Sequence, residues 1–269
     1  MNSLYKAELK YMQPANMLEP KLLNLGIRDG REFDNPGWEK TGFELVDFPS
    51  AVTDWQDEQM IQDRHYDEVI ERAKAMTGCD IALVSGHILR NPEQEKVHSD
   101  LGPIQFVHSD FAPSYHNRLK QHYASGNAQT DEAMQKAGIT AKDMADAKRM
   151  VILQFWRNVG EEVMDLPLAM CDARTVAPNE IVPIPVSDYA GGGFDFEALG
   201  IAAPEDDHHA WYVFPHMNRD EAIAFRTFDS ALVGDGAFWT PHSAIRDPAV
   251  SVGEPARYSI ELRATCLYF

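Results

Sequence analysis

Two residues of types that bind metals, His108 and Asp110, lie two positions apart in the apolar segment Gln105–Phe111. Successive side chains of a β-strand point to opposite faces, so a strand here would place both on one face. With one more histidine they would form a facial triad of two histidines and one carboxylate, which leaves coordination positions open and is typical of non-haem Fe(II) sites. A pair at this spacing is also common on protein surfaces, so it does not define a site alone.

The same spacing recurs at His98 and Asp100. Their surroundings are polar and turn-like, with the segment 94–96 before them and Gly102-Pro103 after them. A metal-binding corner needs a rigid strand, so the apolar surroundings favour His108 and Asp110.

His242 is the best candidate for the third ligand, because it ends the aromatic segment 238–241 at a turn. Alone it would more often be a structural histidine. His208 and His209, which follow the acidic segment 205–207, are the main alternative metal donors.

Fifteen residues after His242, polar and apolar residues alternate. Arg257, Ser259, Glu261 and Arg263 would share one face of a strand. If this strand lies antiparallel to that of His242, Arg257 and Ser259 could bind a carboxylate through charge-assisted hydrogen bonds. A surface salt bridge is the alternative role for Arg257.

The composition bounds the class of protein. The chain has 269 residues, with 42 acidic and 24 basic residues and a net charge of -18, which argues against nucleic acids and anionic membranes as partners. Cys79, Cys171 and Cys266 are widely spaced and odd in number, which is typical of unpaired thiols in a reducing compartment. Without a secretory signal or an apolar run long enough to span a bilayer, we expect a cytoplasmic protein.

The hydrophobic pattern predicts mainly β structure with helical insertions in one domain, residues 1–269. Residues 1–80 should form an N-terminal arm and an amphipathic helix over 57–77 with Gly78 as its C-cap, and 116–150 a helical insertion with a capping box at Thr140 and Asp143. The strands are expected at 43–48, 79–84, 151–156, 166–173, 210–214, 222–228, 237–240 and 258–268, with a loop over 86–95. Such short strands suggest an antiparallel sandwich or barrel.

Taken together, H-x-D, a distant histidine and R-x-S fifteen residues further on are more specific than any part. The chain resembles the Fe(II)/2-oxoglutarate-dependent oxygenases, and residues 85–269 resemble the CmcJ/AsaB-like hydroxylase/desaturase family of secondary metabolism. The segments that carry this resemblance are Gly102-Pro103, Val107–Phe111, Phe155–Arg157, Leu166–Leu168, Cys171–Arg174, Trp211–Pro215, Phe228–Ser230, Thr240–Ala244 and Arg257–Arg263.

The resemblance implies a double-stranded β-helix, a cupin-like jelly roll. It implies Fe(II) bound by His108, Asp110 and His242, and 2-oxoglutarate bound by Arg257 and Ser259. A dioxygenase of this kind uses O2 to hydroxylate or desaturate a small-molecule substrate and releases succinate and CO2. Trp156 and Arg157 would lie near the pocket and contact co-substrate or substrate, although a core tryptophan and a structural arginine are the plainer roles.

Some features depart from the family pattern or leave choices open. Ala112 stands where a threonine is expected two residues after Asp110, and the 116–150 insertion is long. Asp110 argues against halogenation, because halogenases of this fold replace the carboxylate. A co-substrate-free iron oxidase of the same fold, a cupin-like binding module and, more weakly, a zinc hydrolase remain alternatives. Neither the substrate nor the oligomeric state, a homodimer included, follows from the sequence.

Overall fold

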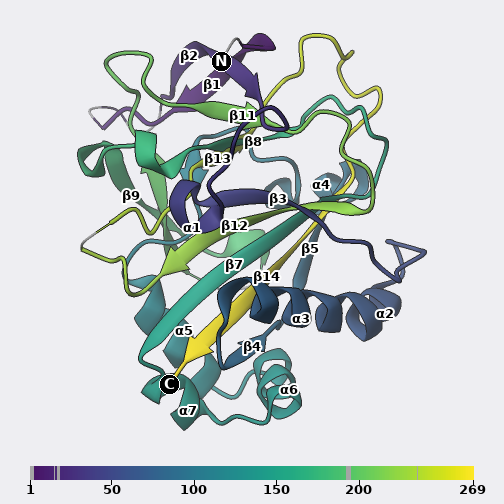
Figure 1. The fold of residues 1–269 in the computed structure, drawn as a ribbon, viewed down its shortest axis with the longest axis vertical. Helices are drawn as coiled ribbons and strands as arrows, with labels where there is room; N and C mark the ends of the chain where they lie inside the picture. Colours follow the sequence, from purple (N-terminus) through teal and green to yellow (C-terminus); the bar gives the residue numbers. More distant parts are fainter. Residues whose placement is uncertain (1–2, 15, 17–18, 192–194, 235) are drawn as a thin grey trace.

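The computed structural model describes residues 3–14, 16, 19–191, 195–234 and 236–269. Most strands belong to two sheets (Figure 1). The eight-stranded sheet has the order β1-β2-β11-β8-β13-β6-β10-β9. Its strands are β1 (Tyr5–Tyr11), β2 (Lys21–Asp29), β6 (His108–Ser109), β8 (Leu168–Cys171), β9 (Ile181–Val186), β10 (Phe196–Ile201), β11 (Trp211–Val213) and β13 (His242–Ala244).

The second sheet has the order β3-β12-β7-β14-β4, and β5 also pairs with β14. Its strands are β3 (Phe43–Asp47), β4 (Ile81–Leu83), β5 (His87–Arg90), β7 (Arg149–Asn158), β12 (Glu221–Asp229) and β14 (Ser259–Tyr268). The two long strands β7 and β14 pair over ten residues, from Ser259 opposite Asn158 to Tyr268 opposite Arg149. This mainly β, jelly-roll architecture confirms the predicted fold class.

Strand β14 is buried on both faces, which is unusual for an antiparallel strand. Ile260, Leu262 and Ala264 belong to a core cluster with Val69 and Ala73 of helix α3 (Tyr66–Thr77). The alternate residues Ser259, Glu261 and Arg263 belong to the opposite face, which points toward the space between the two sheets. One strand therefore carries an apolar face toward a helix and a polar face toward the interior.

Helices cover the second sheet and one end of the molecule (Figure 1). They are α1 (Trp38–Thr41), α2 (Glu58–Met60), the π-helical turn η1 (Ile61–His65), α3, α4 (Pro92–Val97), α5 (Tyr115–Ala124), α6 (Ala128–Ala137) and α7 (Ala141–Asp146), with short 3₁₀ turns η2 (Ser99–Leu101), η3 (Ala173–Thr175), η4 (Pro178–Glu180) and η5 (Tyr189–Gly191). The predicted helix over 57–77 is confirmed, with Gly78 as its left-handed C-cap, and so is the Thr140/Asp143 capping box of α7.

Two local predictions were wrong. The expected loop over 86–95 contains β5, and then α4, which Asn91 caps and Pro92 begins. The expected strand at 237–240 does not form. The amide of Thr240 donates to Ser109 Oγ instead of to a neighbouring strand, and Pro241 has no amide to donate.

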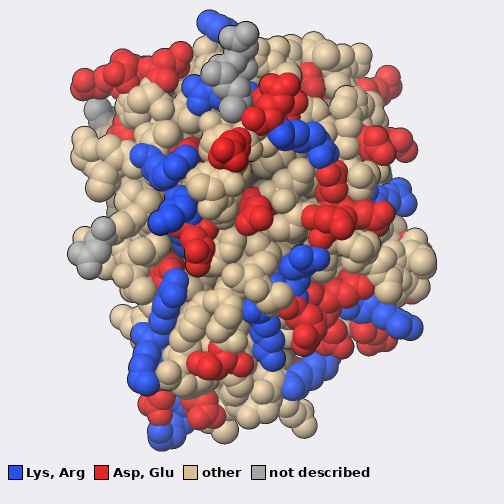
Figure 2. All heavy atoms as spheres, in the orientation of Figure 1, with Lys and Arg blue, Asp and Glu red and all other residues tan. Residues whose placement is uncertain are grey.

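Acidic and basic side chains are interspersed over the face drawn in Figure 2. Cys79, Cys171 and Cys266 are buried free thiols. Within the described residues, no helix is both long and apolar enough to cross a membrane.

Candidate metal centre

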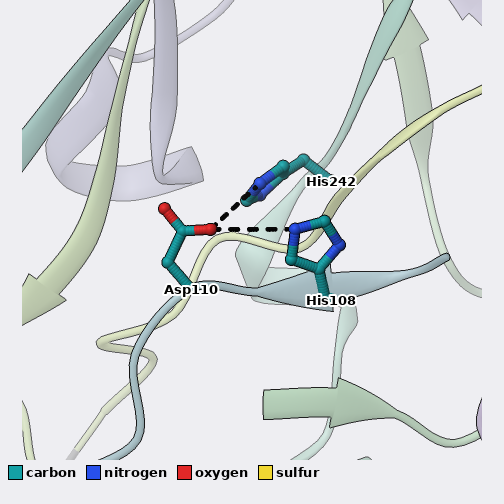
Figure 3. A group of neighbouring side chains, drawn as sticks. All are labelled: His108, Asp110 and His242. Carbon is teal, nitrogen blue, oxygen red and sulfur yellow. Dashed lines mark ion pairs between the residues drawn. The ribbon is translucent and has the colours of Figure 1, made fainter. Parts of the chain in front are cut away.

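His108, Asp110 and His242 meet in the interior (Figure 3). His108 lies opposite His242 on the neighbouring antiparallel strands β6 and β13, and their ring centroids are 4.4 Å apart. Cross-strand partners on one face are close neighbours, so strand pairing alone brings the two imidazoles together. Asp110 does not lie on the strand as expected, because β6 ends at Ser109 and the chain bends there.

Hydrogen bonds orient both imidazoles. Nδ1 of His108 lies 2.6 Å from the carbonyl oxygen of Phe106, and Nδ1 of His242 lies 3.0 Å from that of Thr240. A carbonyl can only accept, so each Nδ1 carries a proton, which leaves each Nε2 as the nitrogen that can bind a metal when the ring is neutral. Metal-binding histidines are typically oriented in this way.

The two Nε2 atoms converge on one oxygen of Asp110. Oδ1 lies 3.7 Å from Nε2 of His108 and 3.4 Å from Nε2 of His242. All three donor atoms lie within 4.8 Å of one another. Two imidazole nitrogens and one carboxylate oxygen suit a divalent metal of the first transition row.

The charge states at neutral pH suit a cation. Burial, together with His242, lowers the pKa of His108 to about 4, so its ring is neutral. Burial alone would raise the pKa of Asp110, but Arg263 and the two histidines outweigh it and hold that pKa well below its usual range. The site therefore offers the negative charge of Asp110 and the neutral ring of His108.

The polar residues of β14 reach the same space from the opposite sheet. The expectation that this strand lies antiparallel to the strand of His242 was wrong, because β13 pairs with β6 and β8 whereas β14 pairs with β4, β5 and β7. A small cavity of about 20 Å³ is lined by both faces, from Arg257 and Glu261 to the three candidate ligands.

Arg257 is 4% exposed. Its Nε donates to Ser259 Oγ at 2.9 Å and its Nη1 to the carbonyl oxygen of Leu166 at 3.3 Å. The guanidinium lies over the ring of Trp156, 5.0 Å from its centroid. Within the described residues it has no carboxylate partner, so it is a buried cation available to an anion.

Sequence reasoning missed a second arginine in this space. Arg90 on β5 is buried and bonds the carbonyl oxygens of Asp100 and Gly102, the Tyr189 hydroxyl and, at 2.8 Å, Glu261 Oε1. Arg90 lies opposite Ser259 in the pairing of β5 with β14, and this pairing places Arg90 next to the small cavity. No local pattern reveals a contact of this kind.

A larger cavity of about 750 Å³ opens onto His108 and Asp110. Its walls are mostly apolar and aromatic, with Arg90 and Arg263 as cationic members. The apolar and aromatic residues include Ile88, Ile104, Phe106, Phe111, Ile184, Val186 and Phe196. A cavity of this size and character is typical of a small-molecule site.

Trp156 and Arg157 occupy different environments. Trp156 is buried beneath Arg257, and its indole Nε1 has no hydrogen-bond partner within the described residues. Arg157 donates to the carbonyl oxygens of Phe48 and Arg219 and stacks on Phe48 and Trp55, as a structural arginine would.

The alternative metal donors lie elsewhere. His208 and His209 contact Glu180, at 2.9 Å to Oε1 and 3.1 Å to Oε2 respectively. The Tyr11 hydroxyl holds Nδ1 of His209 and accepts from Trp211. The possible ligand atoms of Glu180, His208 and His209 also lie within 4.8 Å of one another, so this group remains the alternative metal site. His98 and Asp100 lie in a partly exposed turn, where Nδ1 of His98 is 3.6 Å from Oδ2 of Asp100 and that oxygen also accepts a hydrogen bond from the amide of Ala190.

Comparisons with known proteins relate the chain to a family of oxidoreductases. A family model described as "Oxidoreductase/YMDC permease-like domain" matches residues 3–267. The hydroxylase/desaturase CTB9 of Cercospora beticola is 31% identical over 248 residues, covering 85% of this chain and 70% of that protein. The hydroxylase/desaturase efuI of Hormonema carpetanum is 29% identical over 242 residues, covering 86% and 78%.

Solved structures support the fold. That of the iron and alpha-ketoglutarate-dependent endoperoxidase NvfI superposes with a TM-score of 0.76 at 20% identity, covering 97% of this chain and 96% of that one.

Proposed function

The chain belongs to the oxidoreductase family whose model it matches and to the Fe(II)/2-oxoglutarate-dependent hydroxylases and desaturases, and we propose that it oxidises an apolar small molecule with His108, Asp110 and His242 as iron ligands. The observation that carries this assignment is the convergence of the two Nε2 atoms on Asp110 Oδ1 beside the buried Arg257, whose guanidinium has only neutral hydrogen-bond partners among the described residues.

The residues present fit Fe(II) and 2-oxoglutarate. Three ligands on one side of a metal leave the remaining positions open to a chelating 2-oxo acid and to O2. Fe(II) with this co-substrate and O2 supplies the oxidation, in which 2-oxoglutarate leaves as succinate and CO2.

The chain's own residues bind and orient these groups. Arg257 would donate to the distal carboxylate of 2-oxoglutarate, and Ser259, whose oxygen already accepts from Arg257, has its own proton to donate. A space of about 20 Å³ has room for roughly one water, so co-substrate binding must also use the larger cavity or move side chains along this wall.

The substrate would occupy the cavity of about 750 Å³ next to His108 and Asp110. Its aromatic and aliphatic walls exclude water and favour a largely apolar molecule. We further propose that residues 1–269 act as one catalytic unit, since β2 pairs with β11 and β3 with β12 across the length of the chain.

The test is an anaerobic titration with Fe(II) and 2-oxoglutarate that follows the visible metal-to-ligand charge-transfer band. Wild type should give the band, and His242→Ala should lose it because one of three ligands is gone. Iron binding without the band would refute use of 2-oxoglutarate and leave the co-substrate-free oxidase. A band of full strength in His242→Ala would refute the ligand assignment.

A further inference from the structure

The two oxygens of Asp110 have different surroundings. Oδ1 faces the two imidazoles, at 3.4 and 3.7 Å. Oδ2 accepts two hydrogen bonds from Arg263, from Nη2 at 3.0 Å and from Nε at 3.3 Å. Only one oxygen of the carboxylate is therefore directed at the candidate metal position.

Arg263 is itself held in place. Its Nη2 lies 3.6 Å from Glu261 Oε1, and its guanidinium lies 5.5 Å from the centroid of the Phe111 ring. Glu261 is fixed in turn by Arg90 at 2.8 Å and by Gln154 at 3.3 Å. A planar guanidinium held on three sides cannot turn away from Oδ2 without breaking this network.

We propose that Arg263 is a positioning residue that restricts Asp110 to binding the metal through Oδ1 alone. This inference rests on the proposed iron site. Carboxylates bind metal ions through one oxygen or through both. A second oxygen on the metal would fill one of three open positions, and a chelating 2-oxo acid together with O2 needs all three.

Arg263 also connects the metal position to the substrate space. It lines the cavity of about 750 Å³ and a second, more polar cavity of about 390 Å³. Tyr115 and Ile88 line both cavities as well, so these three residues form a wall between them. A bound substrate would cover the guanidinium and shield its pairing with Asp110 from water, which strengthens the pairing.

The experiment uses the full chain loaded with Co(II) without O2, in wild type, Arg263→Met, Arg263→Lys and Arg149→Met. Arg149→Met is the matched control, because Arg149 also pairs with a buried aspartate, Asp229, but at the far end of β7. The readouts are the Co(II) dissociation constant, the Co(II) absorption spectrum, which reports coordination number, and the 2-oxoglutarate dissociation constant by calorimetry.

We expect Arg263→Met to weaken Co(II) binding by about 10- to 100-fold, the usual effect of losing an outer-shell partner. Its Co(II) spectrum should change, and 2-oxoglutarate binding should weaken while Arg257 is intact. Arg263→Lys should recover part of both, because it restores the charge but not the paired hydrogen bonds. Arg149→Met should match wild type.

Three results would overturn the inference. Retention of the wild-type spectrum and of both affinities in Arg263→Met would refute positioning while leaving the iron site in place. Equal loss in Arg149→Met would show that the effect is general destabilisation. Absence of Co(II) binding in wild type would refute the proposed iron site itself. If Arg263→Met does not fold, Arg263→Lys provides the test. A wild-type Co(II) spectrum and an unchanged 2-oxoglutarate affinity in Arg263→Lys would refute the need for a paired guanidinium.

Discussion

Replacing Arg257 with methionine should separate co-substrate binding from stability. The guanidinium is buried, and its only hydrogen-bond partners within the described residues are neutral, namely Ser259 Oγ and the Leu166 carbonyl oxygen. Burial, followed by the nearby charge of Arg90, lowers its pKa to about 9, which still leaves it cationic at neutral pH. It is thus a desolvated cation that a carboxylate would stabilise.

The magnitude follows from that burial. Loss of one partner from a buried, charged hydrogen-bonded pair costs about 2–5 kcal/mol in binding, so the 2-oxoglutarate dissociation constant should rise by about 30-fold to 4,000-fold. Ser259→Ala removes one uncharged donor and should cost about 1 kcal/mol, or about 5-fold. The ratio between the two variants tests whether charge dominates.

Stability without ligand should move little. Arg257→Met loses two hydrogen bonds and the contact with Trp156, but it also removes the desolvation cost of an unpaired buried charge. These effects oppose each other, so the free energy of unfolding should change by no more than about 1 kcal/mol, a shift of about 2–4 °C in Tm.

Calorimetry with 2-oxoglutarate on the Mn(II)-loaded protein and thermal unfolding of the metal-free protein measure the two quantities. Metal affinity should be unchanged, because Arg257 contacts none of the three candidate ligands. Unchanged 2-oxoglutarate affinity would refute the role of Arg257 in binding. A Tm lower by more than about 10 °C would show instead that its role is structural.

Three further predictions follow from other contacts. Arg157→Met should lower the free energy of unfolding, measured in urea, by about 2–4 kcal/mol, because it removes hydrogen bonds to the carbonyl oxygens of Phe48 and Arg219. It should leave the charge-transfer band intact, and loss of the band without loss of stability would make Arg157 a ligand-binding residue. Gly42→Ala should destabilise the protein by about 2–4 kcal/mol and weaken metal binding, since a Cβ at φ +93° would collide with Thr240, whose carbonyl oxygen orients His242. The control Gly78→Ala, at φ +65° in open space, should cost only about 1 kcal/mol and leave metal binding unchanged. Equal metal affinity in the two variants would contradict this reasoning. Burial would raise the pKa of Glu68, but hydrogen bonds from His65, Ser50 and the Ala51 amide lower it to about 2. The ionised Glu68 carboxylate therefore stabilises the fold above its ordinary pKa of 4.5, and this stabilisation is lost as pH falls toward 2. The Tm difference between wild type and Glu68→Gln should narrow below about pH 4, and a constant difference would refute this.

Local patterns predicted the long elements and the identity of the candidate ligands. The long, almost wholly buried β7 is visible as a hydrophobic run, β14 as an alternation of polar and apolar residues, and the cap of α7 as Thr140 and Asp143. The three candidate ligands could be named because their types and spacing are chemically restrictive.

The pairing of strands could not be predicted in the same way. Alternation along residues 257–263 predicts that Arg257 and Ser259 share a face, but this pattern is the same whichever of the two sheets the segment joins. Only the long-range pairing with β7 and β5 decides it, and that pairing also brings in Arg90. Asp110 shows the local counterpart, because a two-residue strand that ends in a bend is too short for side-chain alternation to place the carboxylate.

The charged side chains on and next to the polar face of β14 differ in whether they have a partner of opposite charge. Burying a charge is costly unless it is paired, so a largely buried strand that carries charged residues must supply partners for them. Glu261 has Arg90 and Arg263 has Asp110. Arg257 lies on the same face and, within the described residues, has only neutral partners. A metal dication held by Asp110 would leave Arg257 without compensation, whereas a dicarboxylate bound beside both would supply a negative partner for Arg257 and offset part of the charge of the metal.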